Sequence, residues 1–467
     1  AVSVSVPRTR LTSRTQTLRA MIIRGVLVLC CVVASLADTP ANCLFEDIRG
    51  SWTFSETERN GDHTINCDTL GSIVYTKTFT LNFPNTVTDE LGNQGTWNII
   101  YNQGFEVNIN ERSYFAFSYY EGNFTSSVSY CDRTLNGWSR DKTVRNWSCF
   151  RGEKLSKTLR RENVNLEKEM NTRLFKNDHK MIEDINASQN SWRAKAYPQH
   201  ERYTVEQMQR RAGGRRKPIL TQPAPATPEQ KVRASFLPEN FDWRDVEGVN
   251  YVSPVRDQES CGSCYAFATM GMLEARLRIA TRNQRQDVFS TQDIISCSEL
   301  AQGCDGGFGY LIGGRYPHEQ GVVADECNPY TAQDDPCITD TTCSRTYVSE
   351  YKYVGDFFGG CNEELMLDAL MEGGPLSVAF MVYDDFESYS GGIYHHTGFK
   401  NGYNPLENTN HEVLLIGYGV DADTGEKFWT VKNSWGTDWG EEGFFRIRRG
   451  TDECGIESEV TQATVIP

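Results

Sequence analysis

Apolar and polar positions alternate with a period of two through much of the N-terminal half of the chain. Three runs show this pattern: SIVYTKTFTLNF, GTWNIIYNQGFEVNIN and SYFAFSYYEGNFTSSVSY. Turns rich in Gly and Asn separate them, and successive side chains of a β-strand point to opposite faces of a sheet. We therefore predict an antiparallel β-barrel or sandwich over residues 44–150. Composition alone leaves a lectin-like or an inhibitor-like module open.

A different period appears further along the chain. Residues 265–281, YAFATMGMLEARLRIAT, are strong helix formers with apolar residues three and four positions apart. The run VLLI at 413–416 ends in a Gly-Tyr-Gly turn, and FWTVK at 428–432 is a second apolar run, so both indicate buried strands. Because strands dominate the first half and helices and strands mix in the second, the predicted fold class is α+β.

The first 37 residues follow neither pattern. Residues 1–20 are rich in Arg, Ser and Thr without an acidic residue, whereas residues 21–37 have a basic start, a short apolar core and small residues at their end. This is the pattern of a secretory signal peptide, and its apolar core is too short to span a bilayer. We expect upstream non-native sequence at 1–20, a signal peptide at 21–37 and a mature start at Asp38. A transit peptide is the alternative.

Residues 152–236 have an unusual charge. They hold 18 Lys and Arg against 10 Asp and Glu, although the whole chain has a formal net charge of −15. We predict helices here, including NVNLEKEMNTRLFKNDHKMIEDINASQNSWRA, followed by a loose tail, AGGRRKPILTQPAPATPEQ. A basic segment on an acidic body suits a propeptide that is held partly by charge and released by proteolysis at an exposed linker. A solvated linker between domains is the alternative.

The candidate nucleophile lies in QESCGSCYAF, residues 258–267. Cys264 stands at the start of the helix expected at 265–281, where the partial positive charge of a helix N-terminus favours a thiolate. Without the two cysteines of the signal segment, 13 of the 15 remain, an odd number that reserves one thiol. A disulfide between Cys261 and Cys264 is the simpler alternative. A zinc site is weakly supported, because no second pair of cysteines or nearby His matches.

A nucleophilic cysteine needs a base, and the chain has seven histidines. His411 stands out because it directly precedes the apolar run 413–416. Asn433 follows the second apolar run and would orient the imidazole in a Cys/His/Asn arrangement. His411 follows Cys264 by 147 residues, a separation expected of proteases with this arrangement. Gln258 is placed to add a side-chain donor to the Cys264 backbone N–H in an oxyanion hole.

Further stretches complete the pattern, namely CSELAQGCDGGF, TNHEVLLIGYG, KNSWGTDWGEEGFFRIRRGTDECGIES and the opening LPENFDWRD. Together with QESCGSCYAF they resemble the papain family of cysteine peptidases. The resemblance implies a peptidase domain over 237–467, with Cys264 on the central helix of a helical half and the His and Asn in a β-rich half. A polar loop near Lys400 is a candidate cleavage point between a heavy chain, 237–400, and a light chain, 401–467.

Tyr265 stands where most of that family has Trp, and the upstream chain is unusually long. Both features are similar to the branch of the family that removes dipeptides from free N-termini. For that branch the resemblance implies that residues 38–151 form an exclusion domain, which blocks the cleft, and that residues 152–236 are an activation propeptide. The carboxylate of Asp38 would hold the substrate's α-ammonium and so penalise substrates that lack it.

The resemblance also implies a chloride ion near the second specificity pocket. The hydroxyl of Tyr353 and backbone donors around Phe308 and Tyr310 would hold it. Gly309 replaces a Pro common in that motif. Glu412 follows His411 where the family usually has a small residue, and its charge would favour the imidazolium and shift the working pH. A homotetramer, three chains per protomer and a separate activating protease are further implications.

Five disulfides are implied by the resemblance, which leaves Cys361 and Cys454 undecided between a disulfide and two thiols. The implied pairs are Cys43–Cys131, Cys67–Cys149, Cys261–Cys304, Cys297–Cys337 and Cys327–Cys343.

Three sequons, at Asn123, Asn146 and Asn186, indicate passage through the secretory route and a lysosomal or secreted glycoprotein. The predicted function is a cysteine exopeptidase that releases N-terminal dipeptides from peptides and proteins through a thioester acyl-enzyme. A papain-type endopeptidase with an accessory β module is one alternative. A non-catalytic binding protein on a papain scaffold is another, disfavoured because the nucleophile and base are intact. Neither nucleic acid nor a membrane is an expected partner.

Overall fold

The computed structural model describes residues 39–123, 126–156, 160–164, 172–213, 222–401 and 409–467. All of them belong to one compact unit, residues 36–467. The predictions for residues 1–38 therefore fall outside the described residues. None of the helices within the described ranges is long and apolar enough to cross a membrane.

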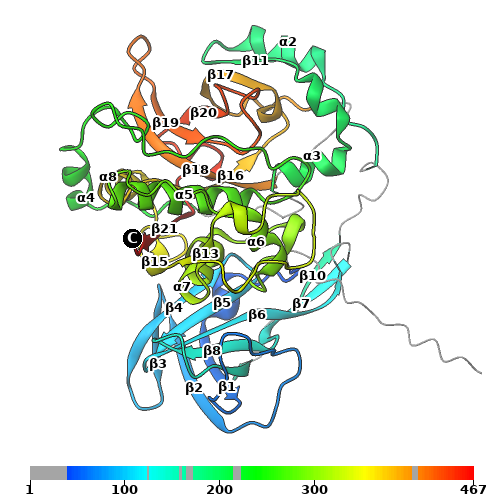
Figure 1. Ribbon diagram of the computed structural model, residues 1–467, viewed down its shortest axis with the longest axis vertical. Helices are drawn as coiled ribbons and strands as arrows, with labels where there is room; N and C mark the ends of the chain where they lie inside the picture. Colours follow the sequence, from blue (N-terminus) through cyan, green and yellow to red (C-terminus); the bar gives the residue numbers. More distant parts are fainter. Residues whose placement is uncertain (1–38, 124–125, 157–159, 165–171, 214–221, 402–408) are drawn as a thin grey trace, which may run out of the picture. The chain divides into compact units, whose positions relative to one another are not determined.

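Residues 50–154 form an antiparallel barrel, blue to cyan in Figure 1. Its strand order is β1-β2-β3-β4-β5-β6-β8-β9, and β9 pairs with β1 to close it. The prediction left a barrel or a sandwich open, and this closing pair decides for the barrel. Large side chains such as Trp52, Phe79 and Trp97 fill its interior. The elements are α1 (Phe45–Ile48), β1 (Gly50–Glu56), β2 (Tyr75–Asn82), β3 (Thr86–Asp89), β4 (Gln94–Ile100), β5 (Gly104–Ile109), β6 (Arg112–Asn123), β7 (Ser126–Thr134), β8 (Gly137–Asp141) and β9 (Ser148–Lys154).

The helices predicted between the barrel and residue 237 are only partly confirmed. The 32-residue stretch NVNLEKEMNTRLFKNDHKMIEDINASQNSWRA contains one described helix, α2 (His179–Ser188), which Asp178 caps. It begins within a strand, β10 (Arg160–Val164), that pairs with β7. It ends in β11 (Trp192–Ala194), which joins the sheet of the C-terminal half beside β17 because its alternate side chains are buried there. The segment continues with η1 (Pro198–Arg202), α3 (Val205–Arg211) and α4 (Pro228–Ala234).

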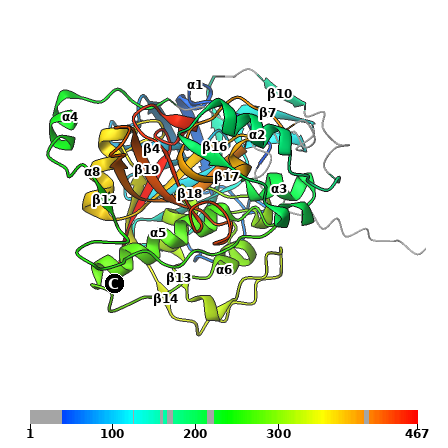
Figure 2. The ribbon, with the colours of Figure 1, turned by 90° about the horizontal axis from the view of Figure 1, so that it is seen from above.

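In the C-terminal half a central helix, α5 (Cys264–Ala280), packs beside strand β18 (Thr409–Val420), as Figures 1 and 2 show. Gly271 permits this approach, since a β-carbon there would lie 3.1 Å from a methyl of Leu414. The sheet runs β11-β17-β20-β19-β18-β16-β21-β15. Its remaining strands are β15 (Val348–Tyr353), β16 (Leu376–Val382), β17 (Tyr389–Tyr394), β19 (Lys427–Lys432), β20 (Phe444–Arg448) and β21 (Val460–Val465).

Shorter elements complete this half and the α+β class is confirmed. They are β12 (Phe241–Asp242), α6 (Thr291–Cys297), η2 (Gly303–Asp305), η3 (Leu311–Arg315), α7 (Tyr316–Glu319), β13 (Val322–Val323), η4 (Asp325–Cys327), β14 (Arg345–Thr346), α8 (Glu363–Gly373), η5 (Phe386–Ser388) and η6 (Glu453–Gly455).

The five implied disulfides are all present. Cys261 pairs with Cys304, so both the Cys261–Cys264 disulfide and a zinc site that uses Cys261 are ruled out. Cys264 is not disulfide-bonded, and neither are Cys361 and Cys454, whose state the sequence left undecided.

Candidate active site

Cys264 is the first residue of α5, one position earlier than the predicted helix. This helix lies in the interior, and its side chains are buried from Cys264 to Arg278. The hydroxyls of Ser263 and Tyr330 lie 2.8 Å apart and tie the start of the helix to the following chain. Cys264 is 4% exposed. Its place at the positive end of a long helix favours the thiolate over the thiol.

His411 lies inside β18, not before it as predicted, because pairing with β16 extends the strand back to residue 409. The Nε2 atom of His411 lies 2.8 Å from Oδ1 of Asn433, and the ring of Trp435 stacks on the imidazole at 5.1 Å. The Nδ1 atom has no hydrogen-bond partner among the described residues and can accept a proton. Burial and the charge of Arg211 lower the pKa of His411 to about 4, against the effect of the Asn433 bond.

Gln258 is completely buried beside the start of α5. Its Nε2 donates to the carbonyl of Cys261 at 2.9 Å, and its Oε1 accepts from the hydroxyl of Ser434 at 2.6 Å. The amide nitrogen carries two hydrogens, and the Cys261 bond uses one of them. Ser434, which the sequence did not single out, therefore fixes the orientation of the candidate oxyanion donor.

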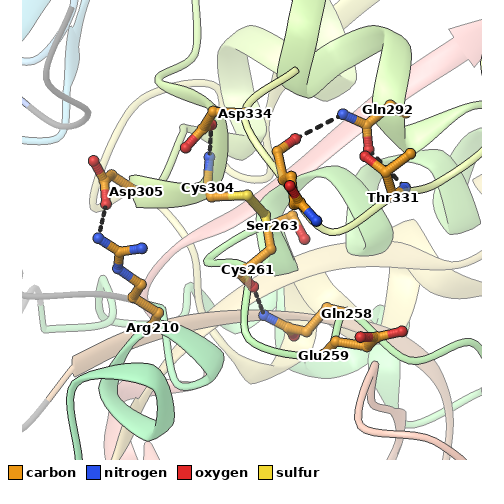
Figure 3. Close-up of a disulfide and its surroundings, with 12 residues drawn as sticks. Arg210, Gln258, Glu259, Cys261, Ser263, Gln292, Cys304, Asp305, Thr331 and Asp334 are labelled. Carbon is orange, nitrogen blue, oxygen red and sulfur yellow. Dashed lines mark hydrogen bonds and ion pairs between the residues drawn. A yellow bond between two sulfur atoms is a disulfide. The ribbon is translucent and has the colours of Figure 1, made fainter. Parts of the chain in front are cut away.

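The Cys261–Cys304 disulfide ties the loop before α5 to the loop that contains η2 (Figure 3). Tyr265, the second residue of α5, covers one of these loops. Its hydroxyl donates to the carbonyl of Gly303 at 2.9 Å, and its ring fills the space where a β-carbon of residue 307 would be, 2.4 Å away. Gly307 is needed here because any side chain would displace this ring.

Helix α3 lies against the same region from the other side. The indole N–H of Trp435 donates to the carbonyl of Arg211 at 3.0 Å, and Nη1 of Arg211 donates to Oδ1 of Asp257 at 3.0 Å. Arg210 forms an ion pair of 3.0 Å with Asp305, next to the disulfide in Figure 3. With α3 in place His411 is 0% exposed. No periodicity or motif in the sequence pointed to these contacts.

Comparisons with known proteins now place the chain. The model of the papain family cysteine protease matches residues 237–464, and the model of the cathepsin C exclusion domain matches residues 38–154. Over 445 residues the chain is 38% identical to Cathepsin C from Schistosoma mansoni, an alignment that covers 93% of this chain and 96% of that protein. The chain belongs to the papain family of cysteine proteases, in its cathepsin C branch.

Other relatives of this cysteine peptidase match about half of the chain. It is 40% identical over 257 residues to Cathepsin B-like cysteine proteinase 6 of Caenorhabditis elegans, which covers 48% of this chain and 65% of that protein. The structure of digestive procathepsin L2 proteinase from the Tenebrio molitor larval midgut covers 61% of this chain and 89% of its own, at 29% identity and a TM-score of 0.51. The alignment with Cathepsin C covers 93% of this chain, whereas these two matches cover 48% and 61% of it. Only the first of the three is therefore long enough to include both the barrel and the peptidase domain.

The residues expected around the second specificity pocket of the peptidase lie together. Tyr310 stacks on Tyr353, with ring centroids 4.4 Å apart. A β-carbon on Gly309 would lie 1.6 Å from Oε1 of Glu412, so the carboxylate takes the space that a side chain at 309 would need. The hydroxyl of Ser377 donates to the same oxygen at 2.7 Å. The two departures from the family motif, Gly309 and Glu412, are thus one coupled feature.

Tyr353 offers a donor that suits an anion. It is 1% exposed, and its hydroxyl has no hydrogen-bond partner among the described residues. Burial, followed by the charges of Glu459, Glu412 and Glu106, raises the pKa of Tyr353 well above its usual value, so the hydroxyl keeps its proton. A chloride ion fits this donor, although the carboxylate of Glu412 lies nearby.

Asp38 lies outside the described residues, but its neighbour is anchored. Thr39 is buried, and its hydroxyl donates to Oε1 of Gln103 at 3.0 Å, on the turn before β5. Residues 402–408, which follow the expected cut near Lys400, are also outside the described residues.

Of the three sequon asparagines, Asn123 and Asn146 are exposed. Asn186 is half-buried, and its side chain makes two hydrogen bonds with the backbone of Ala194. A glycan therefore fits the first two positions better than the third.

Proposed function

We propose that this peptidase removes dipeptides from the free N-termini of peptides and proteins. The observation that carries the proposal is the contact between the barrel and the second specificity pocket. The rings of Tyr101 and Phe117, both from the barrel, pack on Phe308 with centroids 5.0 and 6.0 Å away. A barrel seated there would leave room for only two substrate residues before the scissile bond. The cathepsin C relative supports the same reading.

Four residues would perform the chemistry. His411 takes the proton of the Cys264 thiol on Nδ1, and the thiolate attacks the scissile carbonyl to form a tetrahedral intermediate. The backbone N–H of Cys264 and the second amide hydrogen of Gln258 stabilise the oxyanion. The intermediate collapses to a thioester while His411 returns the proton to the leaving amine. Water, deprotonated by His411, then hydrolyses the thioester, and Asn433 keeps the imidazole oriented throughout.

Asp38 would select the substrate. Its carboxylate would pair with the α-ammonium of the N-terminal residue, and the anchoring of Thr39 to Gln103 supports a fixed position for it.

The test compares one dipeptidyl reporter amide with and without an N-acetyl cap, using the processed protein at acidic pH with chloride present. We expect a preference of at least about 100-fold in kcat/KM for the free amine, because the cap removes the cation that would pair with the Asp38 carboxylate. Asp38→Asn should lower turnover of the free-amine reporter alone. Equal cleavage of both reporters by the wild-type protein would instead identify an endopeptidase whose barrel leaves the cleft open.

We also propose a chloride ion at Tyr353, with Phe308 and Tyr310 as backbone donors. The unpaired hydroxyl supports it, and the ion would help to order the wall of the second pocket. The carboxylate of Glu412 beside Gly309 repels an anion, so Glu412→Gln should lower the half-saturating chloride concentration for reporter turnover. A chloride response that is absent, or unchanged in this variant, would count against the site. Asp368→Asn, a carboxylate on α8, is a matched control.

Residues 152–236 would be an activation propeptide, removed by another protease, and residue 400 or 401 would mark a second cut.

The signal segment, disulfides and sequons support a lysosomal or secreted glycoprotein, which localisation of a tagged full-length chain would test. A homotetramer rests on the resemblance alone, and the mass of the processed protein in solution would test it.

A further inference from the structure

We propose that Glu106 of β5 is the positioning residue that fixes the barrel against the second specificity pocket and so sets the two-residue limit on the substrate. This inference rests on the proposed dipeptide release. It adds a residue that lies outside every motif of the catalytic half.

Glu106 is completely buried, at 0% exposure, although it lies on the outer face of a barrel strand. Three donors from the catalytic half surround its carboxylate. Nη1 of Arg315 donates at 2.8 Å, and the hydroxyls of Tyr310 and Tyr351 each donate at 3.0 Å. The hydroxyl of Ser113, from the neighbouring barrel strand, adds a fourth bond at 3.2 Å. The barrel therefore contributes one carboxylate, that of Glu106, to a cluster of three donors from the catalytic half. We call these three donors, Arg315, Tyr310 and Tyr351, the socket.

A reciprocal pair completes the contact. Arg140 of the barrel forms an ion pair with Glu319 of α7, which also holds Nε of Arg315 at 2.9 Å. Burial alone would raise the pKa of Glu106, but the charges of Arg315 and Arg140 and the two tyrosine bonds outweigh it and lower the pKa. The contact therefore favours the ionised form of Glu106.

The socket leads directly to the pocket. Tyr310, one of the three donors, stacks on Tyr353, and it stands two residues from Phe308, on which the barrel rings pack. Removing the Glu106 charge would weaken the bond to the Tyr310 hydroxyl and loosen the wall of the pocket.

The turn that leads into β5 also holds the start of the described chain in place. Gln103, which holds Thr39, is three residues before Glu106 on the turn that leads into β5. The backbone N–H of Cys43 also donates to the carbonyl of Asn102 on this turn, at 2.7 Å. One short strand thus connects the anchor of the N-terminal segment to the socket beside the pocket. A shift of β5 would move the N-terminal segment relative to the cleft.

A buried ion network can also act only as a source of stability. The chain offers a matched control for this alternative in Glu56, on β1 of the same barrel. Glu56 is 1% exposed and accepts from Arg59 at 2.6 Å and from the hydroxyl of Ser148 at 2.6 Å. A second cation, Arg112, lies 2.9 Å away. All these partners belong to the barrel itself, so Glu56→Gln weakens the barrel without touching the socket.

The experiment measures kcat and KM of processed wild type, Glu106→Gln and Glu56→Gln on the free-amine reporter and on its N-acetyl form. We expect Glu106→Gln to raise the ratio of blocked to free kcat/KM by about 10-fold or more, the value of one charged hydrogen bond, mainly through a higher KM for the free amine. Glu56→Gln should keep the wild-type ratio even if its Tm falls. Tyr351→Phe, which removes one donor, should change the ratio in the same direction by less.

An unchanged ratio in both Glu106→Gln and Tyr351→Phe would overturn the inference, and so would an equal rise in Glu56→Gln. If Glu106→Gln does not fold, Tyr351→Phe decides alone. A wild-type protein that cleaves both reporters equally would instead overturn the proposed dipeptide release, so the two failures are distinguishable.

Discussion

Cys264→Ala should reduce turnover of the free-amine reporter by at least about 10⁴-fold, because no other group can form the thioester. His411→Ala should cost a similar factor, since the thiol would then lack a base. Both variants should keep the fold. The Cys264 side chain is small and sits at a helix start, and the Ala form adds no atoms to the buried site. Equal CD spectra and Tm values within a few degrees of wild type would establish this.

Two other thiols provide matched controls for the cysteine substitution. Cys361 is buried and Cys454 is half-buried, and neither is disulfide-bonded. Burial raises the pKa of both thiols well above the usual value, so they are poor nucleophiles. Cys361→Ala and Cys454→Ala should therefore retain turnover. Alkylation of the processed enzyme should inactivate it by modifying Cys264 first. Substantial activity in Cys264→Ala would refute the proposed nucleophile.

The catalytic candidates could be found from the sequence because each lies beside a strong local signal. Cys264 starts a run of helix formers, and β18 around His411 and β19 before Asn433 are apolar runs that form buried strands. The predicted boundaries were shifted by a few residues, since strand pairing extends β18 beyond its apolar part. The barrel was likewise predictable from its alternation, but its closure depends on the pairing of two strands about 100 residues apart.

Contacts between distant segments could not be predicted. The strand β11 is short and contains Trp, Arg and Ala, so only its pairing with β17 makes it a strand. Arg315 and Glu106 are 209 positions apart, and nothing in the local pattern of either residue shows the other. The alternation of β5 even suggests that one face is solvated, whereas the catalytic half covers that face. Such positions depend on tertiary packing alone.

Cleavage of the chain between α3 and α4 should produce the second-largest change, a rise in reporter turnover of about 100-fold or more. In the uncut chain Arg211 is 2% exposed and lies over the site, with its backbone carbonyl bonded to Trp435 and its side chain to Asp257. Nη1 also donates to the carbonyl of Glu259 at 2.6 Å. With these contacts in place His411 is 0% exposed, so we expect the uncut chain to keep substrate from the imidazole. Removing the contacts would expose the imidazole and take away a neighbouring positive charge.

Movement of α3 away from His411 should depend on pH and become more favourable as the pH falls. The pKa of His411 is about 4 in the covered state, against an ordinary value of 6.5, so the covered state binds the proton more weakly. Lowering the pH from 6.5 towards 4 therefore favours the uncovered state, by about 2 kcal/mol at pH 5 from this one group. Above pH 6.5 the imidazole is neutral in both states and contributes nothing. Opening of the uncut chain should accordingly increase as the pH falls, and faster hydrogen exchange of the α3 amides would measure it; turnover itself still needs the unprotonated imidazole.

Arg211→Ala tests the covering contact without any cut. The variant loses the side-chain bonds to Asp257 and Glu259 but keeps the catalytic residues. Turnover by the uncut chain should therefore rise by about 10-fold. This factor is expected when two charged hydrogen bonds are lost and water replaces them in part. Arg233→Ala, on α4 of the same segment, is the matched control, because its partners Asp368 and Glu372 lie on α8, away from the site. If Arg211→Ala and Arg233→Ala leave the uncut chain equally inactive, and cleavage brings no rise, then α3 does not hold the enzyme in check and residues 152–236 are only a linker.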